Sequence, residues 1–160
     1  MRSNKEYAID AVEVVKPSIE KLFERTNRQE LHIVIMDPRL KPWDCDFESA
    51  VLHEVSIGSP EQWTIKFDQL ARNKAKQAWQ SRTANLHTQS LHPTSLADDD
   101  VLFYGTFTYG DIVVGCSGVQ QWYDMLISGW IALAMEQLAM HDYQTNKIEN
   151  PTQTYRYNTK

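Results

Sequence analysis

The segment at residues 119–141 constrains the fold more than any other part of the sequence, because its apolar residues lie on two opposite sides of a helix. One stripe comprises Tyr123, Leu126, Ile127, Trp130, Ile131, Ala134 and Leu138, and the other side carries Trp122, Met125, Gly129, Leu133 and Met140. A helix that is apolar on both sides is buried on both sides. One side is expected to cover a sheet. The other needs a second partner, either another subunit or the N-terminal helix, and the sequence leaves these two alternatives open.

The N-terminal half of the chain is expected to form a helix and two strands. Apolar residues at helical spacing predict a helix over 6–25, which Pro17 would kink or split. Runs rich in β-formers predict strands over 31–37 and 50–58, each followed by a turn residue.

A second helix and a hairpin are expected next. Ser59-Pro60-Glu61 resembles a helix start, and that helix would run to Arg82. The polar stretch 84–100 is a long connection that has room for one short strand. Within 101–118, two apolar arms flank Gly110-Asp111, where glycine can supply the positive φ of a tight turn.

The resulting order, α-β-β-α-β-β-α, predicts an α+β fold with a mainly antiparallel sheet flanked by helices. The chain of 160 residues is interpreted as a single domain at 1–144. Residues 145–160 lack periodicity and are expected to form a mobile C-terminal tail.

Charge and cysteine content exclude several classes of protein. A net charge of −5 argues against a general nucleic-acid binder, which needs a basic face. The two cysteines, Cys45 and Cys116, form no CxxC pair, so neither a disulfide framework nor a structural zinc site is expected. The N-terminus has no secretory pattern and no run of 18 apolar residues occurs, so we expect a cytoplasmic protein without a membrane span.

The end of the hairpin, Gly115-Cys116-Ser117-Gly118, is the first candidate site. A strand that turns into a helix through glycine points backbone N–H groups at one spot, which suits a carboxylate or a phosphate. The structural alternative is a tight turn with Ser117 as a helix cap. The glycine spacing does not fit a nucleophile elbow. Cys116 is interpreted as a small buried hydrophobe.

Basic residues and histidines supply weaker candidates. Lys74 and Arg82 lie roughly 12 Å apart along the same helix and form either a solvated face or a cationic wall for an anionic ligand. His87 and His92 share the long connection, where they are either exposed or able to bind a metal or haem iron. Two further histidines, His32 and His53, lie in expected strands and are interpreted as hydrogen-bonded and half-buried.

Three segments of the sequence resemble the GlcG/HbpS-like family, also called the haem-degrading domain family. They are an early strand ending in aspartate, "IVIMDPRLK", a central helix with a Lys-Ala pair, "ARNKAKQAWQSRT", and paired strands closing on Gly-x-Ser-Gly, "YGTFTYGDIVVGCSG". The resemblance implies a profilin-like fold, an oligomer, and roles in haem binding or small-molecule catabolism. It carries over Asp37, Lys74 and Ser117 as site residues.

Together these observations predict a small-ligand-binding protein that forms a homo-oligomer through the helix at 119–141. The ligand, haem or an organic anion, would lie between the Gly115–Gly118 turn, Lys74 and Asp37. No metal site and no defined reaction are predicted, and whether the chain is an enzyme stays open. One rival hypothesis is a hydrolase that uses Ser117 or Cys116 with His53, His87 or His92. Another is a scaffold whose apolar helix binds a different protein.

Overall fold

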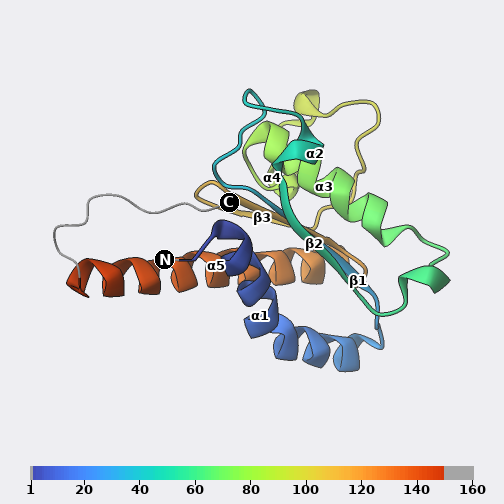
Figure 1. The fold of residues 1–160 in the computed structure, drawn as a ribbon. Helices are drawn as coiled ribbons and strands as arrows, with labels where there is room; N and C mark the ends of the chain where they lie inside the picture. Colours follow the sequence, from blue (N-terminus) through green and yellow to red (C-terminus); the bar gives the residue numbers. More distant parts are fainter. Residues whose placement is uncertain (1, 150–160) are drawn as a thin grey trace.

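The computed structural model describes residues 2–149 and contains one four-stranded sheet between two layers of helices (Figure 1). In chain order, the elements are α1 (Asn4–Thr26), β1 (Leu31–Met36), α2 (Phe47–Ala50), β2 (Val51–Ile57), η1 (Pro60–Gln62), α3 (Phe67–Ser81), α4 (Asn85–Leu91), η2 (Pro93–Ser95), β3 (Thr106–Tyr109), β4 (Ile112–Ser117) and α5 (Gln121–Glu149). The strands lie in the order β2-β1-β4-β3, and every neighbouring pair is antiparallel. The predicted α+β class and antiparallel sheet are confirmed.

The two faces of the sheet bury different cores because side chains alternate along each strand. Ile33 and Ile35 of β1 and Val114 of β4 pack with α1 and α5, which lie below the sheet in Figure 1. Val34, Met36 and Val113 pack on the opposite face, where α3 covers the sheet with Ala71, Ala75, Ala78 and Trp79 and α2 contributes Ala50.

Helix α1 packs against α5 on the same face of the sheet, so the N-terminal helix covers one of the apolar sides of α5. Ile127 and Ile131 are fully buried in that core. A stripe of large apolar side chains on α5 nevertheless stays exposed, with Trp122 at 52%. The other members of this α5 stripe are Leu126, Leu133 and Met140.

Several expectations about the elements are corrected. Pro17 neither splits nor ends α1, because it lies on the exposed side of the helix, where water can hydrogen-bond a freed carbonyl. The helix expected to begin at Ser59 begins at Phe67. There the Ser59 N–H and the Trp63 indole N–H both donate to Glu30, each at 2.7 Å, and this tertiary contact holds the segment in a short 3-10 turn.

The long connection contains a helix, α4, rather than a strand. The first arm of the hairpin is also shorter than expected, since β3 begins only at Thr106. At the C-terminus α5 continues to Glu149, five residues past the expected domain end at 144. The remainder of the expected tail, residues 150–160, lies outside the described residues. Within 2–149, no helix has both the length and the apolar content to cross a membrane.

Candidate ligand-binding cleft

The site begins where β4 ends, at a bend that only glycine accommodates. Gly118 has a φ of +149°, and a Cβ atom added there would lie 2.2 Å from the backbone oxygen of Glu30. The chain therefore turns sharply between Ser117, the last residue of β4, and the start of α5. This bend brings the first turn of α5 close to α3.

Lys74 lies buried at this bend instead of on the outer face of α3. Only 2% of its surface is exposed. Its ammonium group donates to three acceptors, which are the Cys116 carbonyl at 3.2 Å, Ser117 Oγ at 3.3 Å and Asp124 Oδ2 at 3.3 Å. These contacts use all three donors of a protonated lysine. Lys74 and Arg82 therefore do not form a cationic wall, and Arg82 pairs with Asp111 instead.

Asp124, in the first turn of α5, is the residue of the site that sequence reasoning missed. Its Oδ1 accepts a hydrogen bond from the Val119 N–H at 3.0 Å. A backbone N–H group at the bend where an anionic ligand was expected thus binds the chain's own carboxylate. An acidic residue in the first turn of a helix after a glycine bend is the sequence signal for this arrangement.

Burial acts on both members of the Lys74–Asp124 ion pair. It lowers the pKa of Lys74 and raises the pKa of Asp124, because both charged forms lose hydration. The attraction between the two charges opposes each shift. Both pKa shifts therefore favour the neutral forms, the amine of Lys74 and the carboxylic acid of Asp124. In an ion pair this deeply buried, the loss of hydration offsets much of the attraction between the charges. Such a pair beside a cavity is therefore a common mark of a functional site.

An open cleft of about 320 Å³ lies over this ion pair. Its apolar walls come from α3, the segment before it, residue 103 and Val119 just ahead of α5, and Arg28 lies at the cleft with an exposed side chain. Among residues 2–149, the Arg28 side chain forms no ion pair. The lining residues are Arg28, Ile65, Phe67, Leu70, Lys74, Phe103, Ser117, Gly118, Val119, Gln120, Gln121 and Asp124.

Two of the predicted site residues do not line this cleft. Gly115 lies beneath α3, where an added Cβ would come within 2.9 Å of the Ala75 Cβ, so it serves helix packing. Asp37 follows the other end of β1, five residues beyond His32, which pairs with Ser117. At about 3.3 Å per residue this separation is roughly 17 Å. Asp37 instead accepts a hydrogen bond from the Arg39 N–H.

The nucleophile and histidine candidates do not form a hydrolytic site in this geometry. Cys116 is fully buried, and burial raises the pKa of its thiol to about 12. His32 is the cross-strand neighbour of Ser117, but its ring nitrogens contact Ser56 at 2.7 Å and Glu54 at 3.1 Å. Among the residues described, no histidine lines the cleft.

The remaining histidines lie elsewhere. His87 and His92 are exposed on and after α4, with ring centroids 5.2 Å apart. Within residues 2–149, no three metal-ligating side chains of the His, Cys, Asp or Glu type gather at one point.

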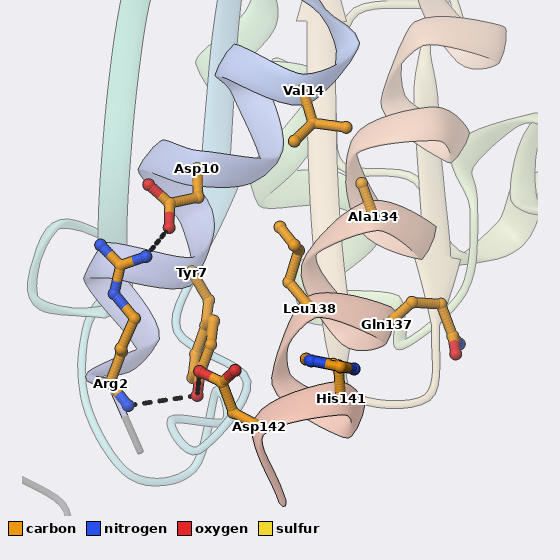
Figure 2. Close-up of a pocket in the computed structure, with 9 residues that line it drawn as sticks. All are labelled: Arg2, Tyr7, Asp10, Val14, Ala134, Gln137, Leu138, His141 and Asp142. Atoms are coloured by element: carbon orange, nitrogen blue, oxygen red, sulfur yellow. Dashed lines mark hydrogen bonds and ion pairs between the residues drawn. The ribbon is translucent and has the colours of Figure 1, made fainter. Parts of the chain in front are cut away.

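A second pocket, of about 360 Å³, lies between α1 and α5 (Figure 2). Its polar groups already bind one another. The Tyr7 hydroxyl donates to Asp142 at 2.8 Å and accepts from the Arg2 backbone N–H at 3.1 Å, while the Arg2 guanidinium pairs with Asp10. This pocket contains no buried charge comparable to Lys74, so we assign the candidate site to the cleft between α3 and α5.

The comparisons with known proteins leave the family of this chain unassigned. No family model matches it, and no curated protein matches it. One solved structure that aligns with it is the crystal structure of a PduOC:heme complex, at 19% identity and a TM-score of 0.48. The alignment covers 82% of this chain and 91% of that chain. The fold and the cleft define an α+β protein with a buried ion pair beneath an open pocket, and the haem is the ligand of the aligned protein.

Proposed function

We propose that this chain binds a small organic anion with an apolar body in the cleft between α3 and α5. The observation that carries the proposal is the cleft itself, in which the buried Lys74–Asp124 pair lies beneath apolar walls and beside Arg28, whose cation has no ion-pair partner among residues 2–149. Small-molecule sites are typically concave and mostly apolar, with a few polar groups that orient the ligand, and they start at roughly 300 Å³. The volume of this cleft suits a small ligand.

The anionic group would lie between Arg28 and Ser117. Lys74 is neutralised by Asp124 and its three donors are in use, so it contributes little net attraction. Arg28 supplies the positive charge, and Ser117 Oγ, which accepts from Lys74, keeps its own proton to donate. The rings of Phe67 and Phe103 would contact the apolar body.

Haem is the less favoured of the two ligands expected from the sequence. Haem iron is held by histidine, cysteine, methionine or tyrosine. Among the described residues that line the cleft, none is of these four types. Membership of the GlcG/HbpS-like family stays a proposal, supported by the quoted motifs.

Binding is also favoured over hydrolysis. Lys74 lies within reach of Ser117 as a base, but acyl transfer also requires N–H groups free to stabilise the oxyanion. The N–H group of Val119, next to Ser117 and Gly118, is taken by Asp124. An ester or amide substrate would therefore meet a hydroxyl without the electrostatic stabilisation that the reaction needs.

The fluorescent probe anilinonaphthalene sulfonate, an aromatic anion, tests the proposal on the full chain. We expect saturable binding that Arg28→Gln weakens by about fivefold, since an exposed ion pair contributes up to about 1 kcal/mol. The matched control is Arg39→Gln, at the Asp37 end of the sheet, which should not change the affinity. Equal affinity in wild type and Arg28→Gln would refute this anion site. A parallel haemin titration that gives a histidine-dependent Soret band would favour haem instead.

We further propose that two copies of the chain associate through the α5 stripe. Its members, Trp122, Leu126, Leu133 and Met140, are spaced by four and seven residues and so lie on one side of the helix. Leu102 and Phe103 are also exposed, and their segment lies beside α5 because the Tyr104 N–H donates to Gln121.

The size of this surface fits a second copy of the chain. At their exposed fractions these six side chains present on the order of 600 Å², given that a large side chain buries roughly 200 Å². A standard interface buries about 800 Å² per partner, and a two-fold axis lets one stripe cover its own equivalent. The mass of the protein in solution distinguishes a second copy of the chain from a different protein partner.

A further inference from the structure

The amine of Lys74 is placed as a reactive group as well as a structural one. Lysine is almost never fully buried unless it is paired. Here the side chain is only 3% exposed, yet Lys74 is one of the residues that line an open cleft whose walls are largely apolar. Such a position keeps water away from the amine while leaving one direction of approach.

We propose that Lys74 forms an imine with a small aldehyde or ketone held in the cleft. This inference rests on the proposed ligand cleft and specifies a class of ligand for it. It depends on the 3.3 Å contact between Lys74 Nζ and Asp124 Oδ2 and on the position of both groups in the cleft lining.

The Lys74–Asp124 contact allows a neutral amine without leaving a polar group unpaired. Transfer of one proton from Nζ to Oδ2 converts the ion pair into an amine and a carboxylic acid. The amine would still donate to the Cys116 carbonyl at 3.2 Å and to Ser117 Oγ at 3.3 Å, and it would accept from the acid. Burial, which lowers the pKa of Lys74 and raises that of Asp124, favours this neutral pair.

The reaction balances with the groups present. The lone pair of Nζ attacks the carbonyl carbon, and the acid proton of Asp124 passes to the carbonyl oxygen. The resulting carbinolamine loses its hydroxyl group as water, with the protons exchanged through Asp124, and a C=N bond to Nζ replaces the C=O bond. The sum is one amine plus one carbonyl compound giving one imine plus one water, with no oxidant or reductant.

The cleft favours small carbonyl compounds with an aromatic or branched apolar part. Phe67, Leu70 and Phe103 provide the contact surface, and the volume of about 320 Å³ leaves little room beyond a single ring with short substituents. Arg28 would add preference for a ligand that also carries an acidic group. A carbonyl acid of this size satisfies both the anion site and the amine.

Reductive trapping on the full chain tests the inference. Benzaldehyde and cyanoborohydride are added at neutral pH, and peptide mapping compares labelling of Lys74 with labelling of Lys76. Lys76 is exposed on the same helix and serves as an internal control within one molecule. Only a neutral amine attacks a carbonyl carbon, and Asp124 lies 3.3 Å from Lys74 Nζ, where it can take the proton. We expect Lys74 to be labelled at least about tenfold faster.

Two variants and the binding assay separate the outcomes. Lys74→Arg should abolish the fast labelling and Lys76→Arg should not. Labelling of Lys74 no faster than that of Lys76 would overturn the imine, and this comparison within the wild type does not depend on whether a variant folds. If the sulfonate probe still binds with its Arg28 dependence in that case, the imine alone fails. If that dependence is also absent, the proposed cleft function fails too.

Discussion

The buried Lys74–Asp124 pair dominates the physical chemistry of the protein at the scale of single residues. Removing one member of such a pair is costly because the other is left buried without its counter-charge. Lys74→Met should therefore reduce the free energy of unfolding by about 3–5 kcal/mol, as measured by urea denaturation. The double variant Lys74→Met with Asp124→Asn should lose less free energy of unfolding than the two single variants lose in sum. Additive losses would show that the two groups do not interact.

Cys116 gives a pH dependence with a definite sign. Its folded pKa is raised from 9.0 to about 12, so the stability it contributes is present below pH 9 and is lost as the pH rises towards 12. This rise in the pKa of Cys116 corresponds to a contribution to the free energy of unfolding of at most about 4 kcal/mol. The free energy of unfolding, measured at pH 8, 9, 10 and 11, should fall more steeply with pH for the wild type than for Cys116→Ala. Parallel curves for the two proteins would contradict the buried thiol.

The part of the site that the sequence predicts is the part determined locally. Ser117 and Gly118 follow from the glycine pattern at a strand end, and Lys74 was proposed from its position on the helix with Arg82 and from a family motif. Asp124 was missed because only the folded chain brings the first turn of α5 next to α3. Asp37 was misplaced because the sequence does not say which end of β1 lies beside β4's last residue.

At the scale of elements, the tight packing of α3 on β4 determines the position of Lys74. Gly115→Ala places a methyl group 2.9 Å from the Ala75 Cβ and 3.0 Å from its backbone nitrogen. Overpacking of this kind costs about 1–3 kcal/mol, and it should also displace α3 and weaken probe binding. Thermal unfolding and the probe titration together measure both effects.

Gly110→Asn is the matched control for that variant. Gly110 has a φ of +56° with open space around it, and asparagine tolerates this conformation. A loss of thermal stability and of probe binding in Gly110→Asn as large as that in Gly115→Ala would contradict the packing argument.

Most elements are predictable from the sequence because their patterns are local. The strands β1 and β4 follow from β-formers, and the turn at Gly110 follows from its glycine. The helix start predicted at Ser59 was wrong because Glu30, distant in sequence, binds this segment and overrides the local helix signal. α4 lacks an apolar periodicity that would reveal it.

At the scale of the whole molecule, the α5 stripe predicts self-association. Light scattering after gel filtration should give the mass of a dimer or larger oligomer, and Leu126→Asp with Leu133→Asp should reduce it to one subunit. Val14→Asp is the control, because Val14 is also an exposed apolar residue but lies on α1. A single-subunit mass for the wild type, with tryptophan fluorescence quenched freely by iodide, would contradict the prediction. A mass that rises only with an added different protein would identify a scaffold.

The central claim is that the cleft above Lys74 and Asp124 holds a small organic anion. A crystal structure of the full chain grown with anilinonaphthalene sulfonate tests it most directly. The account predicts density between Phe103 and Leu70, with the sulfonate beside Arg28 and Ser117 Oγ. Density confined to the α5 stripe or to the pocket between α1 and α5, with an empty cleft, would contradict it.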